Sequence, residues 1–75
     1  MYTQYYFSDK HLYGPKGYAQ SYTDRGFIYS SNGYTQHYID DGYIYGPGGW
    51  TGLYIEDGYV YGANGNSKLP WLKSR

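Results

Sequence analysis

The sequence predicts an all-β fold in which about four β-hairpin units of 16 residues follow one another in tandem. Three observations predict this fold: a 16-residue repeat, a turn dipeptide at a fixed place in each unit, and fourteen tyrosines with twelve glycines among 75 residues. Tyrosine favours strands and glycine supplies the positive φ angles of tight turns, so this composition disfavours helices. The units are residues 8–23, 24–39, 40–55 and the opening of a fourth at 56–66, and residues 2–7 match the second half of a unit.

Each unit contains a two-residue hairpin turn. Asp41-Gly42 and Asp57-Gly58 are strong signals for a turn with positive φ at both central residues, and Arg25-Gly26 is a weaker version. The first unit has Asp9-Lys10 instead, so we expect Lys10 to be held in a backbone conformation that suits glycine better. A two-residue turn also fixes the cross-strand register of its hairpin.

These registers give every hairpin two different faces. We expect the cross-strand pairs on one face to stabilise the hairpins, because this face pairs aliphatic residues, phenylalanine or threonine across the strands. The other face pairs two tyrosines in every hairpin. The pairs on the first face are Phe7–Leu12, Thr23–Ile28, Ile39–Ile44 and Ile55–Val60, and those on the second are Tyr6–Tyr13, Tyr22–Tyr29, Tyr38–Tyr45 and Tyr54–Tyr61.

A second turn, of four residues, links each hairpin to the next. Proline at its second position, as at Pro47, and glycine at its fourth, as at Gly49, suit a turn that closes with a left-handed residue. The strands that these turns imply are residues 2–7, 10–13, 18–23, 26–29, 34–39, 42–45, 50–55 and 58–61.

Two architectures fit these strands. A continuous meander requires successive long strands to slip by four residues per unit, which four-residue partner strands could hardly cover. We therefore favour discrete hairpins stacked into a short β-solenoid. The alternative is a strongly rolled antiparallel meander or small barrel, in which residues 2–7 pair with the last strand and close a ring.

We expect two regions, a β-hairpin repeat domain at residues 2–65 and a C-terminal cap with a basic tail at residues 66–75, in which Trp71 and Leu72 cover the last unit. Residues 1–67 hold three basic and six acidic residues, and three basic residues follow. No stretch has the apolar length of a membrane span or the pattern of a secretory signal. The default expectation is a cytoplasmic protein of bacterial or phage origin; an extracellular or phage-associated protein, or a fragment of a longer chain, would read the same way.

The aromatic face is the leading candidate for a binding surface. Aromatic rings presented between units can stack on sugar rings or enclose a quaternary ammonium group. The simpler interpretation, which we favour, is that the tyrosines form the core, because no aliphatic residue is as plentiful. The candidate ligand-binding residues are Tyr38, Tyr45, Trp50, Tyr54 and Tyr61.

Residues 24–65 carry Asp-Gly hairpin turns, adjacent tyrosine columns and one Gly-aromatic opening at Gly49-Trp50. In these features the stretch resembles the aromatic repeats of bacterial choline-binding modules and clostridial-toxin glycan-binding modules. Their repeat unit is longer, and the Gly-Trp opening occurs only once here. The resemblance implies a binding role of the glycan or choline type, and no individual residue role is transferred from it.

No residue set predicts a catalytic or metal site. His11 and His37 lack a second ligand at metal spacing and a nearby nucleophile, so we expect structural roles for both. Adjacent acids such as Asp40 and Asp41 belong to hairpin turns rather than to a calcium loop. The segment at 46–49 lacks the helix and lysine of a phosphate loop. Binding of single-stranded nucleic acid requires a positive groove, which the acidic body disfavours. We therefore expect no cofactor and no metal.

The sequence therefore predicts a non-enzymatic structural or protein-interaction module, with self-association as one form of it. The alternative is a carbohydrate- or cell-surface-binding module that uses the five aromatic residues named above. The two predictions differ in whether the Tyr/Trp face is closed in a core or open to a ligand.

Overall fold

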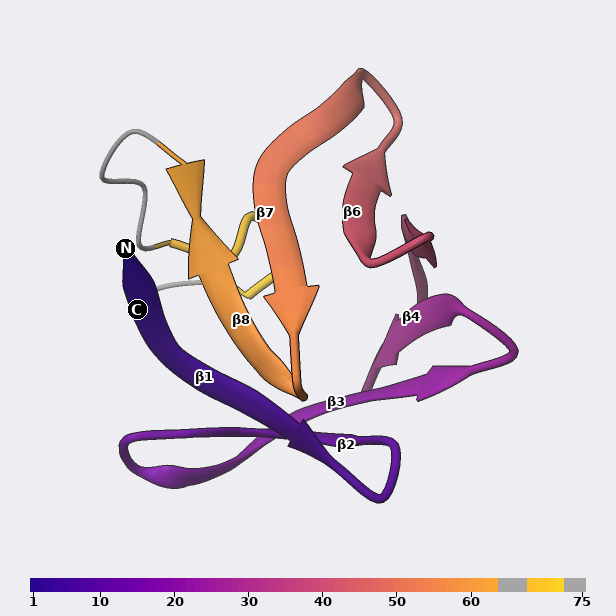
Figure 1. Cartoon of the computed structure of the whole chain (residues 1–75). Coiled ribbons are helices and arrows are strands. Elements are labelled where there is room, and N and C mark those ends of the chain that lie inside the picture. The colour runs from indigo at the N-terminus through magenta and orange to yellow at the C-terminus, as the bar shows by residue number, and fades with distance from the viewer. Residues whose placement is uncertain (64–67, 73–75) are drawn as a thin grey trace.

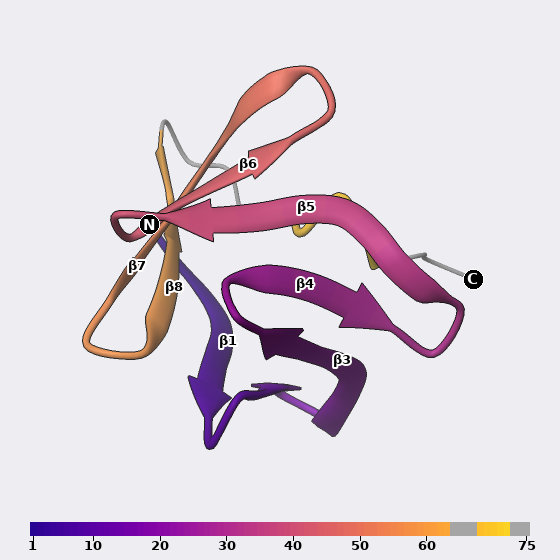
Figure 2. The same cartoon turned by 90° about the vertical axis from the view of Figure 1, so that its right-hand side faces the viewer.

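Eight antiparallel strands follow one another around a closed barrel in the computed structural model, which describes residues 1–63 and 68–72 (Figures 1 and 2). Each expected strand is present, with bounds that differ by at most one residue at either end. The strands are β1 (Tyr2–Ser8), β2 (His11–Gly14), β3 (Gly17–Asp24), β4 (Phe27–Ser30), β5 (Gly33–Asp40), β6 (Tyr43–Gly46), β7 (Gly49–Glu56) and β8 (Tyr59–Gly62).

The first and last strands close the barrel. β1 pairs with β8, with Tyr2 opposite Tyr61 at one end of the seam. At the other end, the Phe7 backbone N–H donates a 2.8 Å hydrogen bond to the Gly58 carbonyl, which links the last hairpin turn to the first strand. The expected all-β fold is confirmed in its small-barrel form, and the stacked-hairpin solenoid that we favoured is not formed.

The four hairpin registers expected from the turn dipeptides are all present. Ile39 lies opposite Ile44 and Tyr38 opposite Tyr45, and the other three hairpins repeat this arrangement. Both central residues of every hairpin turn have positive φ, as the turn type requires. Lys10 has a φ of 73°, so the expectation that a lysine occupies a glycine-type position is confirmed.

The long strands reach two neighbours because each one contains a bulge. In β3, Tyr18 pairs with Tyr13 of β2, whereas Ser21 pairs with Leu12, so the two residues between Tyr18 and Ser21 leave the ladder. Before the bulge β3 pairs only with the preceding short strand β2, and beyond it Ser21 and Tyr22 pair with both β2 and the following short strand β4. One bulge residue in each long strand has a left-handed φ: Gln4 (73°), Gln20 (65°), Gln36 (69°) and Gly52 (86°).

A threonine hydroxyl closes three of the four bulges. In β7, the Thr51 hydroxyl accepts a hydrogen bond from the Leu53 N–H at 3.3 Å and donates one to the Ile44 carbonyl at 2.7 Å. Thr3 and Thr35 make the same two kinds of bond in β1 and β5. The hydroxyl therefore replaces ladder hydrogen bonds that the bulge interrupts.

The apolar side chains that the strands bury in the barrel interior are aliphatic. Its fully buried apolar side chains come from the face on which the hairpins pair aliphatic residues, and each short strand contributes one. The interpretation of the tyrosines as the core is therefore wrong, because an eight-stranded barrel encloses too little space for so many rings. Of the fourteen tyrosines only Tyr5 packs against this core; the buried aliphatic residues of the strands are Leu12, Ile28, Ile44, Leu53 and Val60.

Replacing Lys10 with glycine should raise the free energy of unfolding by about 0.5–1 kcal/mol, because glycine removes the cost of a left-handed backbone at a side-chain-bearing residue. The gain is partly offset by the greater freedom of glycine in the unfolded chain. Urea unfolding of both proteins measures the difference. Lys10→Ala is the matched control: it removes the charge and keeps the Cβ, and an equal gain from it would contradict the backbone explanation.

Candidate functional site

A continuous band of aromatic side chains covers the outside of the barrel. We call this band the aromatic girdle; it has sixteen positions, occupied by thirteen tyrosines, one phenylalanine, one tryptophan and one histidine. These side chains face outward because they alternate along each strand with side chains that face the interior. The girdle positions are residues 2, 6, 11, 13, 18, 22, 27, 29, 34, 38, 43, 45, 50, 54, 59 and 61.

Half of the girdle consists of four stacked tyrosine pairs, one on each hairpin. Tyr38 and Tyr45 have ring centroids 5.4 Å apart with an angle of 13° between the ring planes, and Tyr54 and Tyr61 are 5.6 Å apart at 15°. These four candidate residues therefore form two neighbouring stacked pairs. Each ring is held by its partner, so the stacked pairs contribute to the stability of the hairpins.

The other half of the girdle consists of four pairs of rings at steep angles, which we call aromatic corners. Each corner joins the first residue of a short strand to a ring near the start of the next long strand around the barrel. The fifth candidate residue, Trp50, forms its corner with Tyr43, at a centroid distance of 5.9 Å and an interplanar angle of 86°. The sequence interpretation missed Tyr43, although the same column contains Phe27 and Tyr59 in neighbouring units.

The Trp50–Tyr43 corner is open to solvent. Trp50 is 50% exposed, the highest value among the exposed large apolar side chains of the strands, and Tyr43 is 46% exposed, as are Tyr34 and Tyr59. The Trp50 Nε1–H donates a 3.0 Å hydrogen bond to the Leu53 carbonyl, so the indole lies back along its own strand across the bulge at Gly52. This bond holds the indole ring of the corner in one orientation.

Two electrostatic features characterise the girdle. The aromatic positions themselves carry no carboxylate, but acids border them, because Asp40 lies opposite Tyr43 and Glu56 lies opposite Tyr59. Burial raises the pKa of the Tyr2 phenol above 10.0, and the neighbouring phenols of Tyr59, Tyr6 and Tyr61 raise this pKa further. The Tyr2 phenol therefore favours its neutral form.

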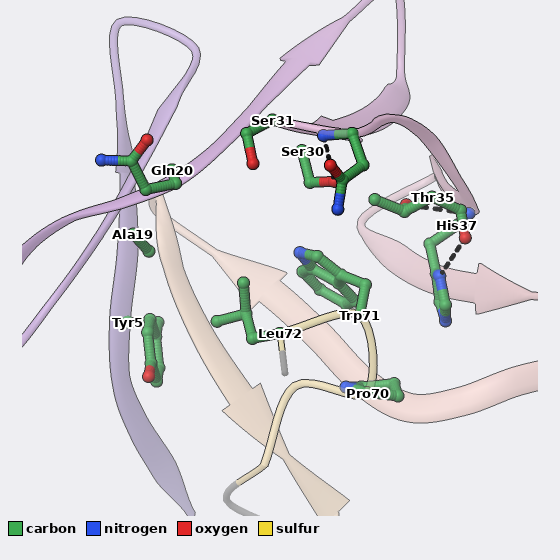
Figure 3. A pocket seen from close by; sticks show the side chains of 11 residues that line it. Tyr5, Ala19, Gln20, Ser30, Ser31, Thr35, His37, Pro70, Trp71 and Leu72 are labelled. Atoms are coloured by element: carbon green, nitrogen blue, oxygen red, sulfur yellow. Dashed lines mark hydrogen bonds between the residues drawn. The ribbon is translucent and has the colours of Figure 1, made fainter. Parts of the chain in front are cut away.

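A second concave site lies beside the turn that joins β4 and β5. It is a cavity of about 700 Å³, and Figure 3 shows Trp71 and Leu72 of the C-terminal segment on one side of it and Gln20 on another. Ser31 of the turn and His37 of β5 complete the wall. Among the described residues, its lining carries no Asp, Glu, Lys or Arg side chain.

The C-terminal segment enters the barrel interior through Trp71. The Trp71 Nε1–H donates a 3.1 Å hydrogen bond to the Ser21 hydroxyl, which itself donates to the Tyr29 carbonyl at 2.7 Å. The Trp71 ring lies 5.1 Å from the His37 ring, and the Leu69 side chain is also buried. Trp71 thus contacts the first two hairpin units. The expected domain boundary at residues 65 and 66 lies outside the described residues.

Both histidines use one ring nitrogen within their own strand region. His11 Nδ1 lies 2.9 Å from the Asp9 carbonyl and His37 Nδ1 lies 3.0 Å from the Thr35 carbonyl, so this nitrogen donates the hydrogen bond in each ring. His11 also lies in the girdle against Tyr18, where it takes an aromatic position as expected. Among residues 1–63 and 68–72, no three His, Asp or Glu side chains gather in a way that could hold a metal ion.

Ser21→Ala should lower the free energy of unfolding by about 1–3 kcal/mol, because it leaves the buried Trp71 N–H and the Tyr29 carbonyl without this hydroxyl. Urea unfolding measures the loss. In a Trp71→Phe background the same substitution should cost less, since the indole donor is already absent. Equal losses in the two backgrounds would contradict the hydrogen bond.

The chain should lose free energy of unfolding above about pH 10, because the pKa of Tyr2 is raised in the folded state. The sign follows from linkage: the contribution of such a group is complete below its unfolded pKa and disappears as the pH rises through the folded pKa. Tyr2→Phe should lose less stability than the wild type between about pH 9 and pH 11 and match it near pH 7. Urea midpoints at these pH values test this, and a parallel decline of both proteins would contradict it.

No helix within the described part of the chain has the length and apolar character needed to cross a membrane. Comparison with known proteins gives no assignment: no protein-family model matches the chain. The curated proteins and the solved structures likewise contain no match to it. A functional interpretation of the aromatic girdle and the cavity therefore depends on their geometry and chemistry.

Proposed function

We propose that this chain is a non-enzymatic binding module for neutral carbohydrate, and that the Trp50–Tyr43 corner is a carbohydrate-binding site. The observation that carries the proposal is the exposure of this corner, where two rings stand at 86° with about half of each side chain open to solvent. The sequence alone favoured a structural or protein-interaction module on the assumption that the rings form the core. The exposed girdle supports the carbohydrate alternative instead.

The shape of the corner suits a sugar ring. One aromatic face can pack against the apolar C–H face of a sugar, while the second ring borders the edge of the same sugar. The Tyr43 hydroxyl can donate or accept a hydrogen bond, which matches the alternating hydroxyl groups of a saccharide. Because the Trp50 indole is already fixed to the Leu53 carbonyl, binding loses little side-chain freedom at this ring.

Charge argues against an anionic ligand. Exposed acids lie directly across the strands from three corner rings: Asp40 opposite Tyr43, Asp24 opposite Phe27 and Glu56 opposite Tyr59. Their carboxylates would repel an anion and can accept hydrogen bonds from the hydroxyl groups of a neutral sugar. Residues 1–67 contain six acidic and three basic residues, which opposes the approach of a polyanion such as nucleic acid. A quaternary ammonium ligand could use the same rings and the Asp40 carboxylate beside Tyr43, so choline is included in the titration below.

The distribution of the rings disfavours one protein partner as the main ligand. A stable protein interface covers about 800 Å² on each partner, whereas this chain exposes 5153 Å² and carries rings around its whole circumference. One flat partner would leave most of the girdle in water. Tyrosine is nevertheless common in protein interfaces, so self-association at high concentration in sedimentation would favour the protein-interaction alternative.

Tyr43→Ala should weaken carbohydrate binding at the Trp50 corner about tenfold, because an aromatic contact of about 1–1.5 kcal/mol is lost. The measurement is Trp50 fluorescence during titration with trisaccharides of glucose, N-acetylglucosamine, mannose and galactose, and with choline chloride. The signal of the buried Trp71 is subtracted with a Trp50→Tyr variant. Tyr59→Ala is the matched control, because it alters the equivalent position of another corner and should leave the Trp50 signal unchanged.

Circular dichroism of both variants shows whether the fold persists. A Trp50 response to at least one saccharide, weakened by Tyr43→Ala and not by Tyr59→Ala, would support the proposal. No response to any saccharide in a folded wild-type chain would contradict it. A response to choline alone would assign the corner to quaternary ammonium ligands instead.

A further inference from the structure

The Trp50–Tyr43 corner has three counterparts around the barrel. In each, the first residue of a short strand meets a ring near the start of the adjacent long strand, at strand pairs β2–β3, β4–β5 and β8–β1. The corners are Phe27–Tyr34 (5.7 Å, 86°), Tyr59–Tyr2 (5.7 Å, 84°) and His11–Tyr18 (5.6 Å, 68°).

All four corners are exposed to a similar degree. The large apolar rings in them are between 39% and 50% exposed, and His11 is also exposed. In the stacked pairs, by contrast, no ring is more than 38% exposed. Corner rings thus combine the greatest exposure with the least parallel overlap, and this combination recurs on every side of the barrel.

The corners point to different sides of the molecule. Successive corners are separated by two strands around the closed wall, in a body of 29 × 26 × 26 Å (Figures 1 and 2). One sugar ring at the Trp50–Tyr43 corner therefore cannot reach the corner on the opposite wall. A long saccharide chain, or several chains displayed on one surface, can occupy two or more corners together.

We propose that the chain is multivalent, with four aromatic corners as separate sites for a repeating neutral polysaccharide or a dense glycan surface. This inference rests on the carbohydrate-binding function proposed above. Each corner alone is shallow and offers only two rings, so each should bind weakly. Linking weak sites raises the apparent affinity by a factor on the order of 10² to 10⁴ when the geometry permits simultaneous contact.

Sequence differences among the corners predict unequal sites. Tyr59–Tyr2 offers two phenol hydroxyls, whereas Phe27–Tyr34 offers one. His11–Tyr18 has the smallest interplanar angle and a ring nitrogen bonded to the Asp9 carbonyl, so it departs most from the other three. We expect the His11–Tyr18 corner to bind most weakly.

Titration calorimetry of the full chain with the trisaccharide that quenches Trp50 most strongly tests the number of sites. We expect roughly three to four sites per chain, the lower number applying if the His11 corner binds too weakly to detect. Tyr43→Ala and Tyr59→Ala should each remove one site, and the double variant two. Asp41→Asn, in a hairpin turn outside the girdle, is the matched control and should leave the number of sites unchanged.

The same trisaccharide coupled densely to serum albumin tests avidity. The wild-type chain should bind this conjugate at least about 100-fold more tightly than the free trisaccharide and should cross-link it into a precipitate. A single site per chain, lost in Tyr43→Ala, with no gain on the conjugate, would overturn the multivalent inference while leaving the proposed function intact. No binding of free or coupled saccharide would overturn both.

Discussion

The left-handed bulge in each long strand is the constraint on which the rest of the structure depends. In β3, Tyr18 pairs with Tyr13 of β2 and Tyr22 pairs with Tyr29 of β4. Without the bulge, one continuous strand could not make both pairings. The bulge takes two residues out of the ladder, so the alternation of inward and outward side chains continues unchanged beyond it. The wall therefore bends and staggers enough to close, while the aliphatic residues stay inside and the rings stay outside.

Local chemistry explains why the hairpins could be predicted and the closure could not. A two-residue turn fixes its own register, so the position of Asp41-Gly42 was enough to place Tyr38 opposite Tyr45. The bulges depend on Gln4, Gln20 and Gln36 with positive φ, and glutamine carries no sequence signal for that conformation. The stagger that argued against a meander is the geometric requirement for a closed barrel.

The orientation of the faces is decided by space rather than by hydrophobicity. Each hairpin has one aliphatic and one aromatic face, and both could be buried in principle. An eight-stranded barrel holds only a narrow column of side chains, which Ile28, Ile44 and their equivalents already fill together with Trp71. The rings must therefore lie outside. Sequence reasoning could identify Tyr38, Tyr45, Trp50, Tyr54 and Tyr61 as a group, but could not place them, because barrel closure was not known.

A contribution to fold stability explains the stacked tyrosine pairs of the girdle more fully than it explains the corner rings. Four stacked tyrosine pairs, each worth about 0.2–1 kcal/mol, are a sufficient reason for parallel rings such as Tyr22 and Tyr29. The corner rings form edge-to-face contacts, which are also favourable, but they are the more exposed rings, so they gain less from burial and enlarge an apolar surface that favours association. The corners are therefore the part of the girdle where we expect a ligand to bind. Trp50 is the most exposed of the corner rings and is held by a hydrogen bond to the Leu53 carbonyl, so binding should first be tested at Trp50.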